Sequence, residues 1–248
     1  SNLKIWQKSD LNFAYKISQL AWLILDKLKA LEYQAKVSVI ISINITHWKQ
    51  PLVETIEPLY RAIQSGLEVG DCEFACYAAH YYCSHLFFSS KNLEQVQTSQ
   101  IKYISLIEKY KQKHQLILAK ILAQVVENIT DKNYRYNRLN GRFIREKETR
   151  MELKQNNNLL AIFSLFFAKY FTSYLFKDYP QALESARLGS KYSGFVKAEV
   201  IYTQHNFYYS LSVLARLETD EPQDLAEVEQ NQALMQYWAE HCPTNYQH

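Results

Sequence analysis

Cys72, Cys76, His80 and Cys83 are the residues whose types and spacing come closest to a metal site. Thiolate and imidazole groups are ligands that zinc prefers. All four residues fall within one predicted helix, however, where a rise of 1.5 Å per residue places the outer two about 16 Å apart. One metal ion with bonds of about 2 Å reaches only two neighbouring ligands of such a row. The pattern favours a buried stripe of small residues, and we predict neither a metal nor a cofactor.

Thiol chemistry is the second possibility in this helix. Cys76 and His80 lie four residues apart, so the thiol and the imidazole could touch. A cysteine nucleophile also needs a group that orients the histidine and a site that stabilises an oxyanion, and the sequence marks neither. It also lacks the Gly-rich phosphate loop, the HExxH and GxSxG motifs and the kinase motifs. We therefore predict no catalytic residues and no enzymatic activity in the chain itself.

A stretch rich in arginine offers a different kind of site. Residues 134–138 read Tyr-Arg-Tyr-Asn-Arg, and further arginines follow. Rings interleaved with guanidinium groups are typical of proteins that bind single-stranded nucleic acid. Acidic residues interrupt the stretch and weaken its positive field, which favours an exposed loop between helices. We predict a contact surface for a partner protein, and not for nucleic acid, at Arg135, Arg138, Arg142 and Arg145.

The composition favours a folded, all-α protein. The chain has 248 residues, 48% of them hydrophobic, with 12 phenylalanines, 19 tyrosines and 4 tryptophans, which is enough to bury a core of domain size. Five glycines and five prolines are too few for the turns of a many-stranded β-protein. The net charge of +3 points by itself to neither a nucleic acid nor a membrane.

Cysteine usage and the chain ends indicate the setting of the protein. Three of the four cysteines share one predicted helix and cannot easily pair, so we predict reduced thiols in a cytoplasmic protein. No apolar run reaches the ~18 residues that span a bilayer. Ser1-Asn2 resembles a remnant left by cloning, and no signal peptide is visible. The sequence also stops without a polar tail. We expect an excised piece of a longer protein.

The elements that must position these residues centre on Tyr170–Gly189, where we expect a helix, a tight turn and a second helix. Asp178 can cap the second helix, and Gln181 three residues later completes a capping box. Ala182 and Ala186 lie one turn apart, so the aromatic residues of the first helix can approach the backbone of the second. This is a helical hairpin of the tetratricopeptide kind.

Two other stretches repeat this helix start. Lys91–Val96 matches Lys177–Ala182 in pattern, and Asp220–Gln223 again combines a capping aspartate, a proline and a glutamine. Spaced hairpins of this type indicate a solenoid. We therefore predict one domain over residues 1–248, a tetratricopeptide-like α-solenoid of about ten helices. A sub-boundary is possible near residues 131–158, where the helical pattern is lost.

Apolar spacing places the other helices. Gly70 suits a helix end, and Asp71 suits the cap of the helix that follows. Residues 37–45 alternate apolar and polar like a strand, and the strand interpretation stays open. We favour a helix because a lone strand among helices would leave its edges unpaired. Helices are predicted over residues 11–31, 53–69, 71–88, 101–129 with at least one break, 159 onward, 195–217 and 224–240.

Several stretches resemble the helical region of very large, chiefly cyanobacterial, signalling proteins. They are Glu73–Leu93 with Gly70-Asp71 before it, Leu139-Asn140-Gly141, the Tyr174–Tyr179 turn and the closing Trp238–His248. The match covers most of the chain from about Leu52 onward. Members of this family carry a Ser/Thr kinase-like domain, an AAA-type ATPase, the helical region, a GAF sensor domain and a histidine kinase. Arg142–Arg150 departs from the family, in which a more acidic and apolar stretch is expected.

The resemblance implies a connector between an ATPase and a GAF domain, in which neighbouring domains carry the activity. We therefore expect a non-catalytic scaffold that contacts those domains or other proteins and transmits conformational signals between them. The alternative is a module that senses a small molecule or a peptide in an aromatic-rich groove, because grooves lined by tyrosine and phenylalanine bind such ligands. No membrane partner is expected.

Overall fold

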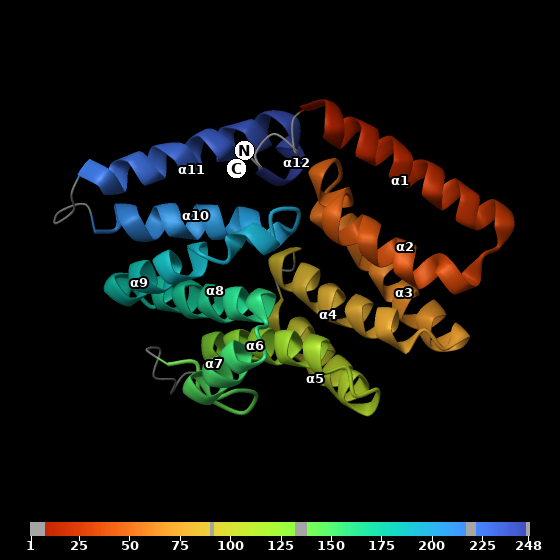
Figure 1. Cartoon of the computed structure of the whole chain (residues 1–248), viewed down its shortest axis with the longest axis horizontal. Coiled ribbons are helices and arrows are strands. Elements are labelled where there is room, and N and C mark those ends of the chain that lie inside the picture. Colours follow the sequence, from red (N-terminus) through yellow and green to blue (C-terminus); the bar gives the residue numbers. More distant parts are fainter. Residues whose placement is uncertain (1–7, 90–91, 132–137, 217–221, 247–248) are drawn as a thin grey trace. The chain divides into compact units, whose positions relative to one another are not determined.

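A computed structural model describes residues 8–89, 92–131, 138–216 and 222–246 (Figure 1). Over these residues it contains twelve α-helices, three short 3-10 helices and no strand. The predicted all-α class is confirmed, with more helices than the ten expected. No helix in the described ranges is both long and apolar enough to cross a membrane.

The α-helices are joined by connections of different lengths. In chain order they are α1 (Lys8–Leu28), α2 (Leu31–Asn44), α3 (Ile56–Val69), α4 (Cys72–Ser89), α5 (Leu93–Lys109), α6 (Lys113–Thr130), α7 (Glu146–Gln155), α8 (Leu159–Leu175), α9 (Tyr179–Ser190), α10 (Val200–Leu214), α11 (Pro222–His241) and α12 (Pro243–Tyr246). The 3-10 helices are η2 (Thr46–Trp48), η3 (Leu52–Thr55) and η4 (Ser193–Phe195).

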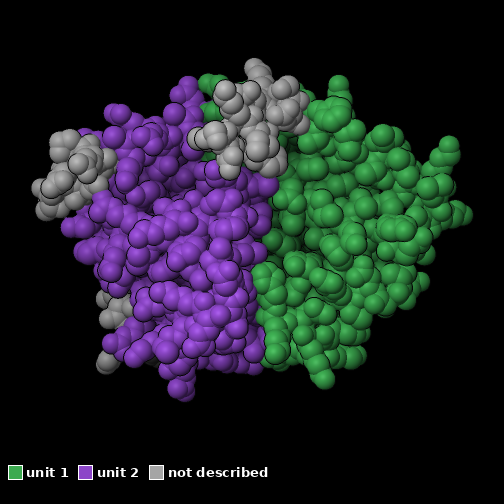
Figure 2. Space-filling model, viewed as in Figure 1, with its two compact units in different colours: residues 1–91, 105–115, 237–248 green, residues 92–104, 116–236 purple. Residues whose placement is uncertain are grey.

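The chain divides into two compact units, which Figure 2 colours separately. Unit 1 comprises residues 1–91, 105–115 and 237–248, and unit 2 comprises residues 92–104 and 116–236. Within unit 1, α2 packs against α1, α3 and α4, and α3 packs against α4. Within unit 2, α8 packs against α7, α9 and α10, and α9 packs against α10. The segment 131–158 belongs to unit 2.

One kind of turn recurs between consecutive helices. A residue in the left-handed conformation is followed at once by the residue that precedes the next helix. At Lys177-Asp178, the N–H of Lys177 donates to the Tyr174 carbonyl at 3.0 Å and the N–H of Asp178 donates to the Ser173 carbonyl at 2.8 Å, the Schellman arrangement. The end of one helix and the start of the next thus share a residue, which makes a tight hairpin. The left-handed residues are Lys29, Gly70, Lys111, Asn157 and Lys177.

Side-chain caps are confirmed at three predicted helix starts. Asp71 accepts from the N–H of Phe74 at 3.2 Å, Asn92 accepts from that of Glu94 at 2.9 Å, and Asp178 accepts from that of Gln181 at 3.3 Å. The third predicted repeat of this start, at Asp220, lies outside the described residues.

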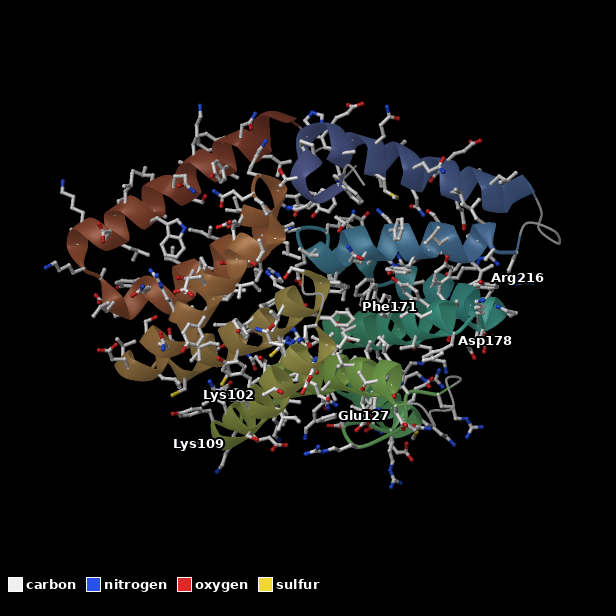
Figure 3. The ribbon with its side chains drawn as sticks, turned by 180° about the vertical axis from the view of Figure 1, so that it is seen from behind. Lys102, Lys109, Glu127, Phe171, Asp178 and Arg216 are labelled. Atoms are coloured by element: carbon white, nitrogen blue, oxygen red, sulfur yellow. The ribbon has the colours of Figure 1, made fainter. Side chains whose placement is uncertain are left out.

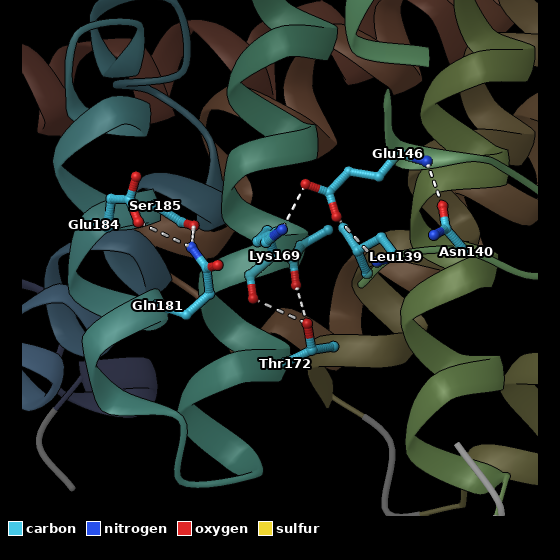
Figure 4. Close-up of polar contacts among 9 residues, drawn as sticks. Leu139, Asn140, Glu146, Lys169, Thr172, Gln181, Glu184 and Ser185 are labelled. Carbon is cyan, nitrogen blue, oxygen red and sulfur yellow. Dashed lines mark hydrogen bonds and ion pairs between the residues drawn. The ribbon is translucent and has the colours of Figure 1, made fainter. Parts of the chain in front are cut away.

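The capping box predicted at Gln181 is wrong. The side-chain amide of Gln181 contacts Glu184 at 3.4 Å and Ser185 at 3.2 Å (Figure 4). In a capping box this amide group would bond to the N–H of Asp178, but that N–H already donates to the Ser173 carbonyl. The turn therefore satisfies this donor with the main chain of the preceding helix.

One predicted helix boundary and the interpretation of one segment are corrected. The helix expected over residues 11–31 ends at Leu28, because Lys29 adopts the left-handed conformation with φ of 49°. The helix favoured over residues 37–45 is confirmed as part of α2. The segment 131–158, where the helical pattern is lost in the sequence, contains α7. The apolar spacing of α7 is hard to recognise because Thr149 and Leu153 are its only buried residues.

Small residues bring neighbouring helices close together. Ala182 and Ala186 are fully buried, as the hairpin prediction requires. A Cβ added to Gly189 would lie 3.1 Å from the Cβ of Phe166, so α9 and α8 approach nearly backbone to backbone at this point. Gly66 of α3 plays the same role in unit 1, where an added Cβ would lie 3.0 Å from that of Ala75 on α4.

Candidate functional site

The predicted arginine-rich surface is built on a loop of fixed conformation in unit 2, residues 138–145, here called the arginine loop. Asn140 and Arg145 form an antiparallel bridge, and the N–H of Gly141 donates to the Ile144 carbonyl at 3.0 Å. Leu139 and Ile144 are buried and anchor the loop in the core.

Two side chains of α6 hold the tip of the arginine loop. Gln124 is fully buried, and its Oε1 accepts from the N–H groups of Phe143 at 3.1 Å and Ile144 at 3.4 Å. Glu127, labelled in Figure 3, accepts through Oε2 from the N–H of Arg142 at 3.1 Å and from the Gln124 amide at 2.8 Å. Three successive main-chain donors of the loop are therefore satisfied from one helix, which leaves the loop little freedom.

Gly141 is required by this close contact. A Cβ added there would lie 2.4 Å from Nε2 of Gln124 and 2.5 Å from Oε2 of Glu127. Both side chains are held by the hydrogen bonds to the loop, so they could make room only by breaking them. Two residues of the Leu139-Asn140-Gly141 tripeptide thus have a structural role: the leucine is buried, and the glycine lies in contact with α6.

Glu146, the first residue of α7, holds the base of the arginine loop (Figure 4). Its Oε2 accepts from the N–H of Leu139 at 3.2 Å, and its own N–H donates to Oδ1 of Asn140 at 2.9 Å. Its Oε1 pairs with Nζ of Lys169 on α8 at 2.6 Å, and the two side chains are only 18% and 15% exposed. The charge of Glu146 is therefore neutralised mainly by Lys169, so it reduces the positive potential of the loop only slightly.

Three of the four predicted contact residues come together on this loop, and all three are exposed. The guanidinium of Arg142 lies 5.3 Å from the centre of the Phe143 ring. Arg145 lines a shallow hollow of about 450 Å³ with Asn140, Gly141 and Glu148. Arg135 lies outside the described residues. The sequence did not reveal Gln124, Glu127 or Glu146 as supports, because polar residues on a helix give no sign of the distant main chain that they bind.

The cysteine and histidine row of α4 is arranged as predicted, along one helix. Cys76, His80 and Cys83 are buried, and all four cysteines are free thiols. Burial raises the pKa of Cys76 to about 11 and that of Cys83 further still. In the part of the chain that the structure describes, no three His, Cys, Asp or Glu side chains are placed to share a metal ion.

Unit 1 also buries a set of neutral histidines. Burial lowers the pKa of His47, His80 and His85 to about 3 in each case. His85 Nδ1 lies 2.7 Å from the Thr55 hydroxyl, which itself donates to the Leu52 carbonyl. Since that hydroxyl has only one proton, His85 must be the donor to it. His47 makes no hydrogen bond of ordinary geometry, although the main chain of Ser42 lies near enough to oppose part of its pKa shift.

In unit 2, the side chains of Tyr170, His205 and Ser190 are arranged in the order of a catalytic triad. The Tyr170 hydroxyl lies 2.7 Å from His205 Nδ1, and Ser190 Oγ lies 3.2 Å from Nε2. The Ser190 hydroxyl donates its one proton to the Ala186 carbonyl at 2.9 Å, so Nε2 must carry the imidazole proton and donate to Ser190. Nδ1 is then the acceptor for the hydroxyl of Tyr170, whose pKa burial raises well above its usual range. An imidazole that donates to the serine cannot act as its base, so the row joins α8, α9 and α10 structurally.

A second candidate site is a cleft of about 740 Å³ in unit 1, lined by residues of α1, α2 and the segment from Gln50 to α3. Its volume falls within the range of small-molecule sites. Glu57 and Arg61 on its edge form an ion pair at 2.7 Å. The lining combines apolar residues (Trp22, Leu25, Ala30, Leu31, Pro58), polar residues (Gln34, Ser38, Gln50) and charged residues (Asp26, Lys29, Glu54, Glu57, Arg61).

Several of the aromatic side chains that suggested a groove lie in the core of unit 2. Phe163 and Tyr170 of α8 are fully buried. The ring of Phe171, labelled in Figure 3, stacks on that of Phe167 at 5.7 Å and meets that of Tyr208 on α10 edge to face at 4.7 Å. These rings hold helices together.

No protein-family model matches the chain, and none of the curated proteins or solved structures compared with it matches either.

Proposed function

We propose that the chain is a non-catalytic, tetratricopeptide-like scaffold that connects domains or proteins in a bacterial signal-transduction kinase. The recurring left-handed turn supports a repeat architecture, because it joins successive helices into similar hairpins in both units. Hairpins of this kind stack into solenoids whose exposed faces bind partners. The resemblance to the helical region of large signalling proteins suggests the neighbours, namely an ATPase and a GAF or histidine kinase module.

The observation that carries the proposal is the arginine loop. Gln124, Glu127 and Glu146 fix its main chain, while Arg142 and Arg145 stay exposed. Guanidinium groups pair with carboxylates through two parallel hydrogen bonds, and a loop that is already ordered loses little entropy when it binds. The partner that fits is an acidic segment on a neighbouring domain.

Calorimetric titration with the ATPase module of such a signalling protein, with and without nucleotide, tests this proposal. We expect binding that differs between the two nucleotide states. The double variant Arg142→Glu with Arg145→Glu should weaken it at least tenfold. Lys102→Glu with Lys109→Glu is the matched control, because it makes the same charge change at two exposed lysines of α5, labelled in Figure 3. Absence of binding in both states, or equal weakening by both double variants, would contradict the proposal.

The cleft of unit 1 favours a second function, the sensing of a small molecule or a peptide. A ligand at 100 times its Kd should stabilise the protein by ~2.7 kcal/mol, which a thermal-shift screen of metabolites and peptides detects. Gln34→Trp places a bulky side chain in the cleft and should abolish the shift. Gln19→Trp, at an exposed position of α1 that does not line the cleft, should preserve it. If no compound stabilises the protein, the sensing function is rejected.

A further inference from the structure

Helix α1 has two apolar faces, and only one of them is covered. The covered face includes Leu11 and Ser18, which are buried, and α1 packs against α2. A second stripe runs along the helix at intervals of three and four residues, which places its members on one side. Each of its members is between 47% and 68% exposed: Phe13, Ile17, Leu20, Ile24 and Leu28.

The stripe has the spacing of a coiled-coil seam. Ile17 and Ile24 lie seven residues apart at the position called a, and Phe13 and Leu20 lie seven apart at the position called d. A β-branched residue at a with leucine at d favours a pair of helices over larger bundles. Ala14 and Ala21 run beside the seam, also seven residues apart, and leave room for a second helix to approach closely.

The area of the stripe matches a dimer interface. The exposed part of each large side chain offers on the order of 100 Å², so the stripe with its exposed neighbour Leu23 offers roughly 600 Å² per chain. That is the upper end of the apolar patches that monomers expose. Two such surfaces together give roughly 1,200 Å², the lower end of specific interfaces.

We propose that this stripe binds the same stripe of a second copy of the chain, so that two α1 helices form the contact of a homodimer. A second α1 has matching heptads by necessity, and an isologous contact needs a surface that is complementary to itself. The five members of the stripe are all apolar, and Lys27, at the d position after Leu20, ends the apolar seam. The stripe therefore selects an apolar helix and not a charged partner. This interface lies in unit 1 and uses no part of the arginine loop, so it goes beyond the proposed scaffold function.

Sedimentation equilibrium of the whole chain between about 1 and 100 μM tests the proposal. We expect a reversible dimer whose dissociation constant rises at least 100-fold in Leu20→Glu. Because Leu20 is half exposed, the dilute variant should keep the helix content of the original. Gln19→Glu on the same helix and Phe195→Glu at an exposed apolar position of unit 2 are the controls and should leave the dimer intact.

A charge-complementary mixture distinguishes self-association through α1 from other effects. Leu20→Glu and Leu20→Lys chains should each be monomeric alone, and mixing them should restore the dimer, because the two side chains would meet across the seam. A chain that is monomeric at 100 μM, or a dimer that Leu20→Glu and Gln19→Glu affect alike, would overturn the proposal. The absence of any recovery in the mixture would overturn it as well.

Discussion

The side-chain amide of Asn245 donates to the main-chain carbonyl of His47 at 2.7 Å, across 198 positions of sequence. The same amide donates to the Gln50 carbonyl at 2.7 Å, and Oδ1 accepts from the N–H of Leu52 at 2.9 Å. One side chain near the C-terminal end of the described chain thus satisfies three main-chain groups of a segment that has no long helix of its own. Trp48 adds a ring contact to Trp238 at 5.9 Å.

Replacing Asn245 should weaken unit 1 strongly. Asn245→Ala removes the three hydrogen bonds and leaves partly buried main-chain groups without partners, so we expect a loss of about 2–4 kcal/mol in the free energy of unfolding. Thr244→Ala, at the exposed neighbouring position, should cost less than about 0.5 kcal/mol. Urea denaturation of the two variants measures this difference. Equal stabilities would show that the contact contributes nothing.

The buried histidines should make unit 1 sensitive to acid. The folded-state pKa of His85 is lowered from the usual 6.5 to about 3, so the stabilisation is complete above pH 6.5 and is lost as the pH falls toward 3. Between pH 7 and pH 5 each such histidine should remove about 2 kcal/mol of stability.

The variant His85→Asn tests this pH dependence. Its amide can still donate to Thr55, so the fold should be kept while one titrating group is lost. The variant should lose about 2 kcal/mol less than the original chain between pH 7 and pH 5, and the two should have parallel profiles above pH 7. If the variant loses as much stability between pH 7 and pH 5 as the original chain, His85 is not a buried neutral group in the folded protein.

In the row formed by Tyr170, His205 and Ser190, removing the Tyr170 hydroxyl should cost more stability than removing the Ser190 hydroxyl. Tyr170→Phe leaves a fully buried imidazole nitrogen without its donor, and we expect a cost of about 1–3 kcal/mol. Ser190→Ala should cost less, because Ser190 is only partly buried and water can take its place. Thermal unfolding of both variants gives the comparison, and a larger loss for Ser190→Ala would contradict the inference that water can replace the Ser190 hydroxyl.

Gly141→Ala should loosen the arginine loop without removing a charge. The added Cβ would displace Gln124 and Glu127 and break their bonds to the loop, at an expected cost of about 1–2 kcal/mol. Hydrogen exchange at the amides of Arg142, Phe143 and Ile144 should become faster. Gly194→Ala is the control, because an added Cβ there meets nothing within 4 Å. Unchanged exchange in Gly141→Ala would contradict the described contact.

Most helices could be predicted from the sequence because their signals are local. Asp71, Asn92 and Asp178 cap the main chain two or three residues away, and Gly70 ends its helix through its own conformational freedom. The left-handed turns at Lys29, Lys111 and Lys177 gave no such signal, since lysine is common on any helix surface and carries no preference for that conformation.

The sequence by itself determined the all-α class, most helix positions and the exposed arginines, because these depend on hydrogen bonds and spacing within a few residues. Only the tertiary structure decided which face of α1 is buried, because that helix is apolar on two sides and the choice depends on where α2 packs. It also decided that Gln124 and Glu127 would hold the arginine loop and that Asn245 would hold the segment after His47. Such contacts depend on how distant segments meet, and a single polar residue in a sequence does not carry that information.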